Sequence, residues 1–242
     1  MSEHPVRNTF LATITVLIFF FAQGAVVVMG ELEGLKAIVV QTSIIWCCAL
    51  AAIICFLMKE HRLASLGFQK PVKGSTAGFL YYIPLIAIAL VAFAGGLKQD
   101  ESGLILPNLI FTLGIGLTEE LYFRGIICNS WREKEKAAIL ISSVLFGLSH
   151  FMNIMGGAGL AGTLLQIVFA FVYGIVMALV MLGTKSILPC IFLHAFHDFC
   201  GFITGEGNEK LVIIVGTIQF VVLLAYCIYL VARKNGLYRR IC

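Results

Sequence analysis

Charge is what this sequence has least of. Only 12% of its 242 residues are Asp, Glu, Lys or Arg, whereas 60% are hydrophobic. Soluble globular domains have about 25% charged and about 45–50% apolar residues. The deficit argues against a soluble domain, because a charge in contact with lipid tails costs several kcal/mol and membrane-embedded chains omit it. The net charge of +4 is too small to indicate a nucleic-acid partner, and we expect none.

Several signatures of known catalytic sites are also missing. The chain has no H-E-x-x-H motif, and this absence argues against a zincin-type metal site. It also has no G-x-S-x-G near a base, which argues against a serine nucleophile. Most of the eight cysteines lie in apolar runs without metal-type C-x-x-C spacing, as small buried residues do. No polar stretch is long enough for a second domain, so residues 1–242 are expected to form a single integral membrane domain.

Long apolar runs take up most of the chain. A helix needs about 20 apolar residues to cross the hydrocarbon core of a bilayer. Eight segments meet this requirement approximately: 9–29, 36–58, 76–97, 104–128, 137–154, 159–184, 186–204 and 210–232. The sequence therefore predicts an all-α, polytopic membrane helix bundle of about eight transmembrane helices that is surrounded by membrane lipids.

The charges between these segments predict their orientation. If the N-terminus is cytoplasmic, thirteen of the seventeen Lys and Arg residues fall in inside segments and three fall in outside loops. The positive-inside rule expects this asymmetry. Both termini are therefore predicted to be cytoplasmic.

Ionisable side chains inside the predicted spans are the main functional signal. Glu119 and Glu120 lie in the fourth span, His150 in the fifth, and His194 and Asp198 in the seventh. At 1.5 Å of rise per residue, they lie roughly 12–20 Å from the cytoplasmic face, in one depth band. Ionisable residues in a membrane are costly and usually functional. We expect one site, accessible from the cytoplasmic side or laterally.

Two pairs with helical i,i+4 spacing lie within this group. Glu120 and Arg124 can form an ion pair, whereas Glu119 points about 100° away around the helix and is left for another role. His194 and Asp198 share a face. A purely structural role remains an alternative for each pair.

Two kinds of chemistry fit these residues. A carboxylate and a neutral imidazole can hold and deprotonate a water molecule, while the second histidine and Asp198 orient or stabilise a developing oxyanion. Alternatively, Glu119, His150 and His194 could ligate a divalent metal such as zinc that carries the nucleophilic water. The residues alone leave both routes open.

The motifs that contain these residues resemble a known family. They are Glu119-Glu120-x-x-x-Arg124, Phe146-x-x-x-His150 and His194-x-x-x-Asp198. In this order and spacing they are similar to the CAAX protease and bacteriocin-processing (abortive-infection) family, which includes the eukaryotic Ras-converting CAAX endopeptidase. The resemblance covers residues 104–204, which we take as the predicted catalytic core.

The resemblance implies intramembrane proteolysis. By this likeness Glu119 and His150 activate water, and His194 and Asp198 support the oxyanion. Glu120, Arg124 and Phe146 match supporting positions. Family members are often labelled metalloproteases, although a glutamate-based mechanism without metal is also proposed, so the resemblance leaves a metal cofactor open.

The position of Asp198 departs from the best-known family members, which have Asn there. An amide can donate a hydrogen bond to an oxyanion, whereas an ionised carboxylate cannot. Asp198 is therefore expected to orient His194 or to bind metal unless it is protonated.

The predicted function is an intramembrane endopeptidase that cleaves a membrane-associated peptide, either a lipidated (prenylated) protein or a leader peptide. The resemblance to bacterial-type members suggests the cell membrane of a prokaryote. Two alternatives remain: a proton- or ion-coupled transporter that uses a Glu/His relay, and a non-catalytic membrane scaffold or immunity protein, because a fold can persist without its chemistry.

Overall fold

The computed structural model describes residues 4–60, 63–72, 79–98, 102–205 and 209–238, and over these ranges the chain is almost entirely helical. The only strand-like feature in them is an isolated antiparallel bridge between Leu97 and Thr204. The helices are α1 (Pro5–Met29), α2 (Gly34–Glu60), α3 (Phe79–Val91), α4 (Ile105–Glu120), α5 (Glu135–Ser149), α6 (Met152–Met155), α7 (Leu160–Thr184), α8 (Leu188–Ile203) and α9 (Glu209–Tyr238), joined in places by short 3₁₀ turns.

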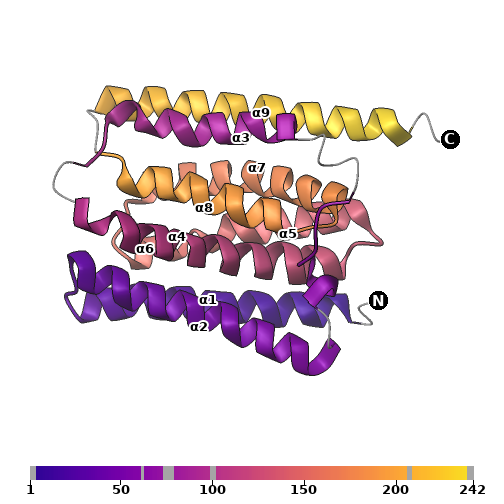
Figure 1. Ribbon diagram of the computed structural model, residues 1–242, viewed down its shortest axis with the longest axis horizontal. Helices are drawn as coiled ribbons and strands as arrows, with labels where there is room; N and C mark the ends of the chain where they lie inside the picture. The colour runs from indigo at the N-terminus through magenta and orange to yellow at the C-terminus, as the bar shows by residue number, and fades with distance from the viewer. Residues whose placement is uncertain (1–3, 61–62, 73–78, 99–101, 206–208, 239–242) are drawn as a thin grey trace.

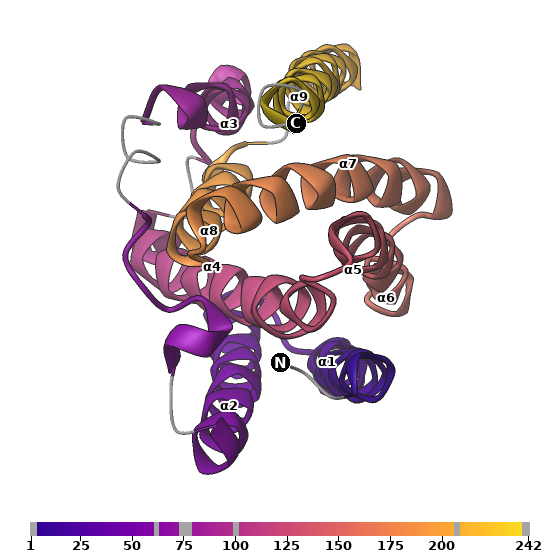
Figure 2. The same ribbon diagram turned by 90° about the vertical axis from the view of Figure 1, so that its right-hand side faces the viewer.

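The helices form three layers (Figures 1 and 2). Helices α4, α5, α7 and α8 make the central layer, in which α4 packs against α8 and α5 packs against α7. On one side α2 packs against α4 and α1, and on the other α3 and α9 pack against each other and against α8 and α7. The residues predicted to form the site lie on α4, α5 and α8 or on the segments that directly follow α4 and α5.

The all-α prediction is confirmed, and a helix corresponds to each of the eight predicted spans. Residues 76–78 of the third predicted span lie outside the described ranges. Five helices are long and apolar enough to cross a membrane: Pro5–Met29, Gly34–Met58, Glu135–Met155, Leu160–Thr184 and Lys210–Arg233. The segments Tyr81–Gly95 and Leu188–Ile203 are shorter apolar helices. The chain is an integral membrane protein.

The fourth and fifth predicted spans are not continuous α-helices, and both interruptions fall at site residues. Helix α4 ends at Glu120, and the chain continues as a π-helical segment, η5 (Leu121–Cys128). Helix α5 ends at Ser149, and His150 caps it before the short helix α6 begins. π-Helical turns within helices are rare and frequently lie at functional sites.

A small residue brings α4 and α8 into close contact. A Cβ atom added at Gly116 on α4 would lie 2.8 Å from the carbonyl oxygen of Ile191 and 2.9 Å from the backbone nitrogen of Ala195. Only glycine fits this contact. One turn further along α4, Glu119 and Glu120 lie beside His194 in the same part of α8.

Candidate active site

A buried ion pair forms the base of the candidate site. Glu120 and Arg124 are both 0% exposed, and Nη1 of Arg124 donates to Oε1 of Glu120 at 3.0 Å. The predicted i,i+4 pair is thus present. The guanidinium also lies over the ring of Phe146, with Cζ 4.3 Å from the ring centroid, a cation–π contact that adds to the stabilisation of the buried charge.

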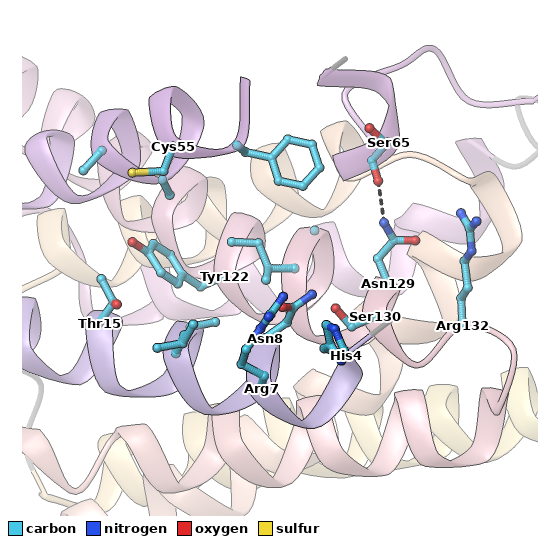
Figure 3. Close-up of a pocket in the computed structure, with 17 residues that line it drawn as sticks. His4, Arg7, Asn8, Thr15, Cys55, Ser65, Tyr122, Asn129, Ser130 and Arg132 are labelled. Carbon is cyan, nitrogen blue, oxygen red and sulfur yellow. Dashed lines mark hydrogen bonds between the residues drawn. The ribbon is translucent and has the colours of Figure 1, made fainter. Parts of the chain in front are cut away.

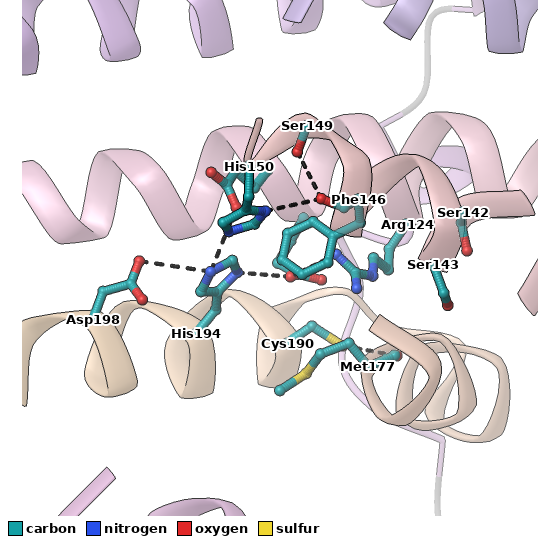
Figure 4. Close-up of polar contacts among 12 residues, drawn as sticks. Arg124, Ser142, Ser143, Phe146, Ser149, His150, Met177, Cys190, His194 and Asp198 are labelled. Carbon is teal, nitrogen blue, oxygen red and sulfur yellow. Dashed lines mark hydrogen bonds and ion pairs between the residues drawn. The ribbon is translucent and has the colours of Figure 1, made fainter. Parts of the chain in front are cut away.

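His194 connects this ion pair to the other acidic residues (Figure 4). Its Nδ1–H donates to the same oxygen of Glu120 at 2.8 Å. The opposite nitrogen, Nε2, lies 3.5 Å from Oε2 of Glu119 and 3.6 Å from Oδ2 of Asp198. Because a hydrogen bond at one ring nitrogen orients a histidine, Glu120 directs Nε2 of His194 toward Glu119 and Asp198.

The two adjacent glutamates have separate partners. Glu120 is engaged by Arg124 and His194, whereas the ion-pair partner of Glu119 among the described residues is His194. This arrangement fits the expectation that Glu119 is not needed for the ion pair and is available for another role.

His150 joins the site through Phe146. Its Nδ1–H donates to the carbonyl oxygen of Phe146 at 3.0 Å, so Nε2 is the unprotonated nitrogen of the neutral ring. The Phe146 ring packs edge-on against both His150 and His194, at centroid distances of 5.1 and 5.6 Å. No hydrogen bond links His150 to Glu119 among the described residues. Phe146 therefore positions both imidazoles with its carbonyl and its ring.

A cavity of about 450 Å³ brings the predicted residues together. Glu119, His150, His194 and Asp198 all line it, and they come from α4, the end of α5, and α8. The aromatic residues Phe20, Phe111 and Phe202 line its walls. Glu120, Arg124 and Phe146 are buried and do not line it. The cavity thus separates the residues predicted to be catalytic from those predicted to be supporting.

The cavity lies in the half of the bundle away from the start of α1 and the end of α9. Its lining comes from the later part of α1, the early part of α2, the α6 region and the last turn of α8, which all lie at the end opposite the labelled chain termini in Figure 1. With the orientation predicted from the loop charges, this is the extracytoplasmic half. The orientation, and access from the cytoplasmic side or laterally, stay predictions.

A second cavity, of about 800 Å³, lies at the other end of the bundle (Figure 3). Its polar lining includes Arg7 on α1, Tyr122 on η5, and Asn129, whose side-chain amide donates to the carbonyl oxygen of Ser65. None of the residues predicted to be catalytic lines it. It is therefore separate from the candidate site.

The predicted metal ligands are not arranged around a metal position. Over the described residues, no group of three or more His, Cys, Asp or Glu side chains could hold a metal ion. In the candidate set, Nδ1 of His194 is bonded to Glu120 and Nδ1 of His150 to a backbone carbonyl, and Nε2 of His194 faces two carboxylates. The arrangement of Glu119, His150 and His194 does not fit a bound metal.

Some residues around the site were not predicted. Tyr173 on α7 packs against His194 at a centroid distance of 5.6 Å, and its hydroxyl is buried without a hydrogen-bond partner among the described residues. The ring of His197 packs against Phe169 and Tyr173, and its Nδ1 lies 3.5 Å from Oδ1 of Asp198. Four amide side chains also line the cavity, and these are Gln23, Gln41, Asn153 and Gln166. The only sign of these amides in the sequence was that polar side chains occur within apolar segments.

The segment that carries the site also matches a protein family. Residues 101–200, from the turn before α4 to α8, match the model of Rce1-like type II CAAX prenyl endopeptidases. The predicted family resemblance is confirmed. The Rce1-like segment contains every residue that the sequence predicted for the site, and the match supports an intramembrane endopeptidase in general. No curated protein matches the chain.

Proposed function

We propose that this protein is a glutamate-dependent intramembrane endopeptidase in which Glu119 and His150 activate water. The observation that supports the proposal best is the different environment of two adjacent glutamates. Glu120 is committed to Arg124 and His194, whereas Glu119 lines the cavity with His150 and Asp198. A carboxylate that lines a cavity and is not committed to Arg124 is suited to accept a proton from water.

Glu119 is assigned as the general base. A water held between Glu119 and Nε2 of His150 attacks the carbonyl carbon of the substrate peptide bond. The water oxygen forms the new C–O bond, and its proton passes to Glu119. When the C–N bond breaks, the same proton goes to the leaving amine, which restores the Glu119 carboxylate.

His194 is assigned to the oxyanion that forms on the substrate carbonyl. Its Nδ1–H is held by Glu120 and Nε2 faces the carboxylates of Glu119 and Asp198, so the ring is assigned as the doubly protonated imidazolium, with Nε2–H directed into the cavity. An N–H donor at this position stabilises charge that develops in the transition state. An ionised carboxylate can only accept hydrogen bonds, so Asp198 is assigned to positioning His194 rather than to the oxyanion.

The proposed setting is the cell membrane of a prokaryote, with both termini in the cytoplasm and a membrane-associated peptide or lipidated protein as substrate. The distribution of Lys and Arg between loops supports the orientation.

The experiment that tests this function uses protein purified in detergent and a panel of internally quenched peptides. The proposal expects cleavage of at least one peptide, with the products identified by mass spectrometry. Proton-driven flux in liposomes without any cleavage would indicate the transporter alternative. Neither cleavage nor flux would leave the scaffold alternative.

A further inference from the structure

The second cavity, of about 800 Å³, carries positive charge at one end. His4 and Arg7 line it from the start of α1, and Arg132 lines it from the turn that follows η5. None of the described residues that line it is Asp or Glu. Neither guanidinium has an ion-pair partner among the described residues. The first turn of α1 contains no acidic residue, and the N-terminal end of a helix favours negative charge. This end of the cavity is therefore suited to an anion.

The rest of the second cavity is largely apolar and lies between α1 and α2. Its walls there include Leu11 on α1 and Ala52 and Phe56 on α2, which belong to apolar helices long enough to cross a membrane. Thr15, the deepest lining residue on α1, lies about 12 Å along the helix from Arg7. A charged end and a long apolar end in one cavity match an amphiphile better than a small soluble anion.

We propose that the second cavity binds an anionic phospholipid, with its phosphate held by Arg7 and Arg132 and an acyl chain between α1 and α2. Guanidinium groups bind phosphate oxygens through paired N–H donors. Basic pockets between transmembrane helices bind the headgroups of anionic lipids. Asn129 and Ser130 add polar side chains to the lining beside the charged end (Figure 3). The site shares no described lining residue with the candidate active site, and it does not depend on which side of the membrane it faces.

A lipid in this cavity contacts the segment that follows the two glutamates of the candidate site. Tyr122, Gly125 and Ile126 on η5 line the second cavity. The same segment carries Arg124, which pairs with Glu120. A ligand that binds the folded protein and not the unfolded chain stabilises the fold. An anionic phospholipid should therefore raise the unfolding midpoint of the protein, whether or not the protein cleaves peptides.

The test uses the full-length protein in detergent and two lipids with identical acyl chains. Dioleoyl phosphatidylglycerol has an anionic headgroup, and dioleoyl phosphatidylcholine has no net charge. We expect native mass spectrometry to show preferential retention of phosphatidylglycerol, and circular dichroism to show a higher unfolding midpoint with this lipid. Equal retention of the two lipids would overturn the proposal. An equal rise of the midpoint with inorganic phosphate alone would also overturn it, because the cavity would then bind an anion without its acyl chain.

Substitutions of the two arginines test the charged end. Arg7→Gln and Arg132→Gln each remove one cation from the cavity, and each should weaken phosphatidylglycerol binding about fivefold, as expected for one basic residue beside anionic headgroups. Lys136→Gln is the matched control. It removes an exposed cation that does not line the cavity but lies close to Arg132 in the chain, at the same end of the bundle. An equal loss in Lys136→Gln would indicate a general surface effect and contradict the proposed site.

Ala51→Phe tests the apolar end without changing any charge. Ala51 on α2 is exposed and lines the cavity, so the phenyl ring would occupy cavity space rather than the packed core. Retention of phosphatidylglycerol should fall, while the unfolding midpoint without added lipid should stay near the wild-type value. The matched control is Leu50→Phe, at an exposed neighbouring residue that does not line the cavity. Unchanged retention in Ala51→Phe, or an equal fall in Leu50→Phe, would contradict the proposed position of the acyl chain.

Discussion

His194 and Glu120 share a hydrogen bond of 2.8 Å between Nδ1 and Oε1, and the same carboxylate oxygen accepts a hydrogen bond from Arg124 at 3.0 Å. One buried glutamate therefore both neutralises a buried cation and orients the imidazole that faces the cavity. Because Glu120 has both roles, substitutions of Glu120 and Arg124 can distinguish an effect on stability from an effect on activity.

Glu120→Gln should reduce stability and activity together. The change leaves the guanidinium of Arg124 buried without a countercharge, and breaking a buried pair in this way costs about 3–5 kcal/mol. The midpoint temperature of unfolding in detergent, followed by circular dichroism, should fall. Turnover of any cleaved peptide should fall with it.

The double variant Glu120→Leu/Arg124→Leu separates these two effects. Replacing a buried ion pair by apolar residues is often neutral or stabilising, so the midpoint should recover toward the wild-type value. Activity should not recover, because Nδ1 of His194 still lacks its acceptor. Recovered activity would show that Glu120 does not orient His194.

Gly116→Val should separate α4 from α8. The added atoms meet the backbone of Ile191 and Ala195, which cannot rotate away as a flexible side chain could. Overpacking of this kind typically costs 1–3 kcal/mol, and it should also move Glu119 and Glu120 away from His194. We expect a lower unfolding midpoint and at least a tenfold loss of activity. The matched control is Gly216→Val, because a Cβ at Gly216 meets nothing within 4 Å.

Asp198→Asn should retain most of the activity. The amide keeps the shape of the carboxylate, can still accept a hydrogen bond from His194, and can also donate one. Asp198→Leu removes both abilities and should lower kcat roughly 10–100-fold, because a hydrogen bond to a charged group contributes about 1.5–3 kcal/mol. If Asn and Leu were equally inactive, the negative charge of Asp198 would be required and its assignment to positioning alone would be wrong.

Activity should not depend on a bound metal. Nδ1 of His150 is bonded to a backbone carbonyl, Nδ1 of His194 is bonded to Glu120, and Nε2 of His194 faces two carboxylates, so among the described residues no three such side chains are arranged to hold a metal ion. Dialysis against a strong chelator should leave kcat/KM unchanged, and elemental analysis should find no stoichiometric zinc. Loss of activity with the chelator, restored by zinc alone, would contradict this prediction.

The helices were predictable because each is a long apolar run, and the site residues because ionisable groups stand out in such runs. The pairing of Glu120 with Arg124 and the shared face of His194 and Asp198 follow from helical spacing, which is local. What depends on packing was less predictable. The sequence does not contain a local signal for the π-helical turns after Glu120 or for the end of α5 at His150. The same holds for Tyr173, which approaches His194 only because α7 packs beside α8.

The end of the bundle at which the cavity lies could not be predicted for a related reason. Depth along straight helices was estimated well enough to group Glu119, His150, His194 and Asp198. The depth of these residues along their helices does not indicate on which side of the group other side chains fill the space. Phe123, Phe146 and Arg124 fill the side toward the start of α1, which leaves the opposite side for the cavity. The single-domain prediction for residues 1–242 stays a prediction.

The most direct test of the account is the turnover of Glu119→Gln on a peptide that the wild-type protein cleaves. This change keeps the size of the side chain and removes its ability to accept a proton from water. The matched control is Glu33→Gln, on an exposed turn before α2. General-base catalysis contributes about 10²–10⁴-fold, so kcat should fall by that factor in Glu119→Gln while the unfolding midpoint and the control remain at the wild-type level. Unchanged kcat in Glu119→Gln would contradict the central claim.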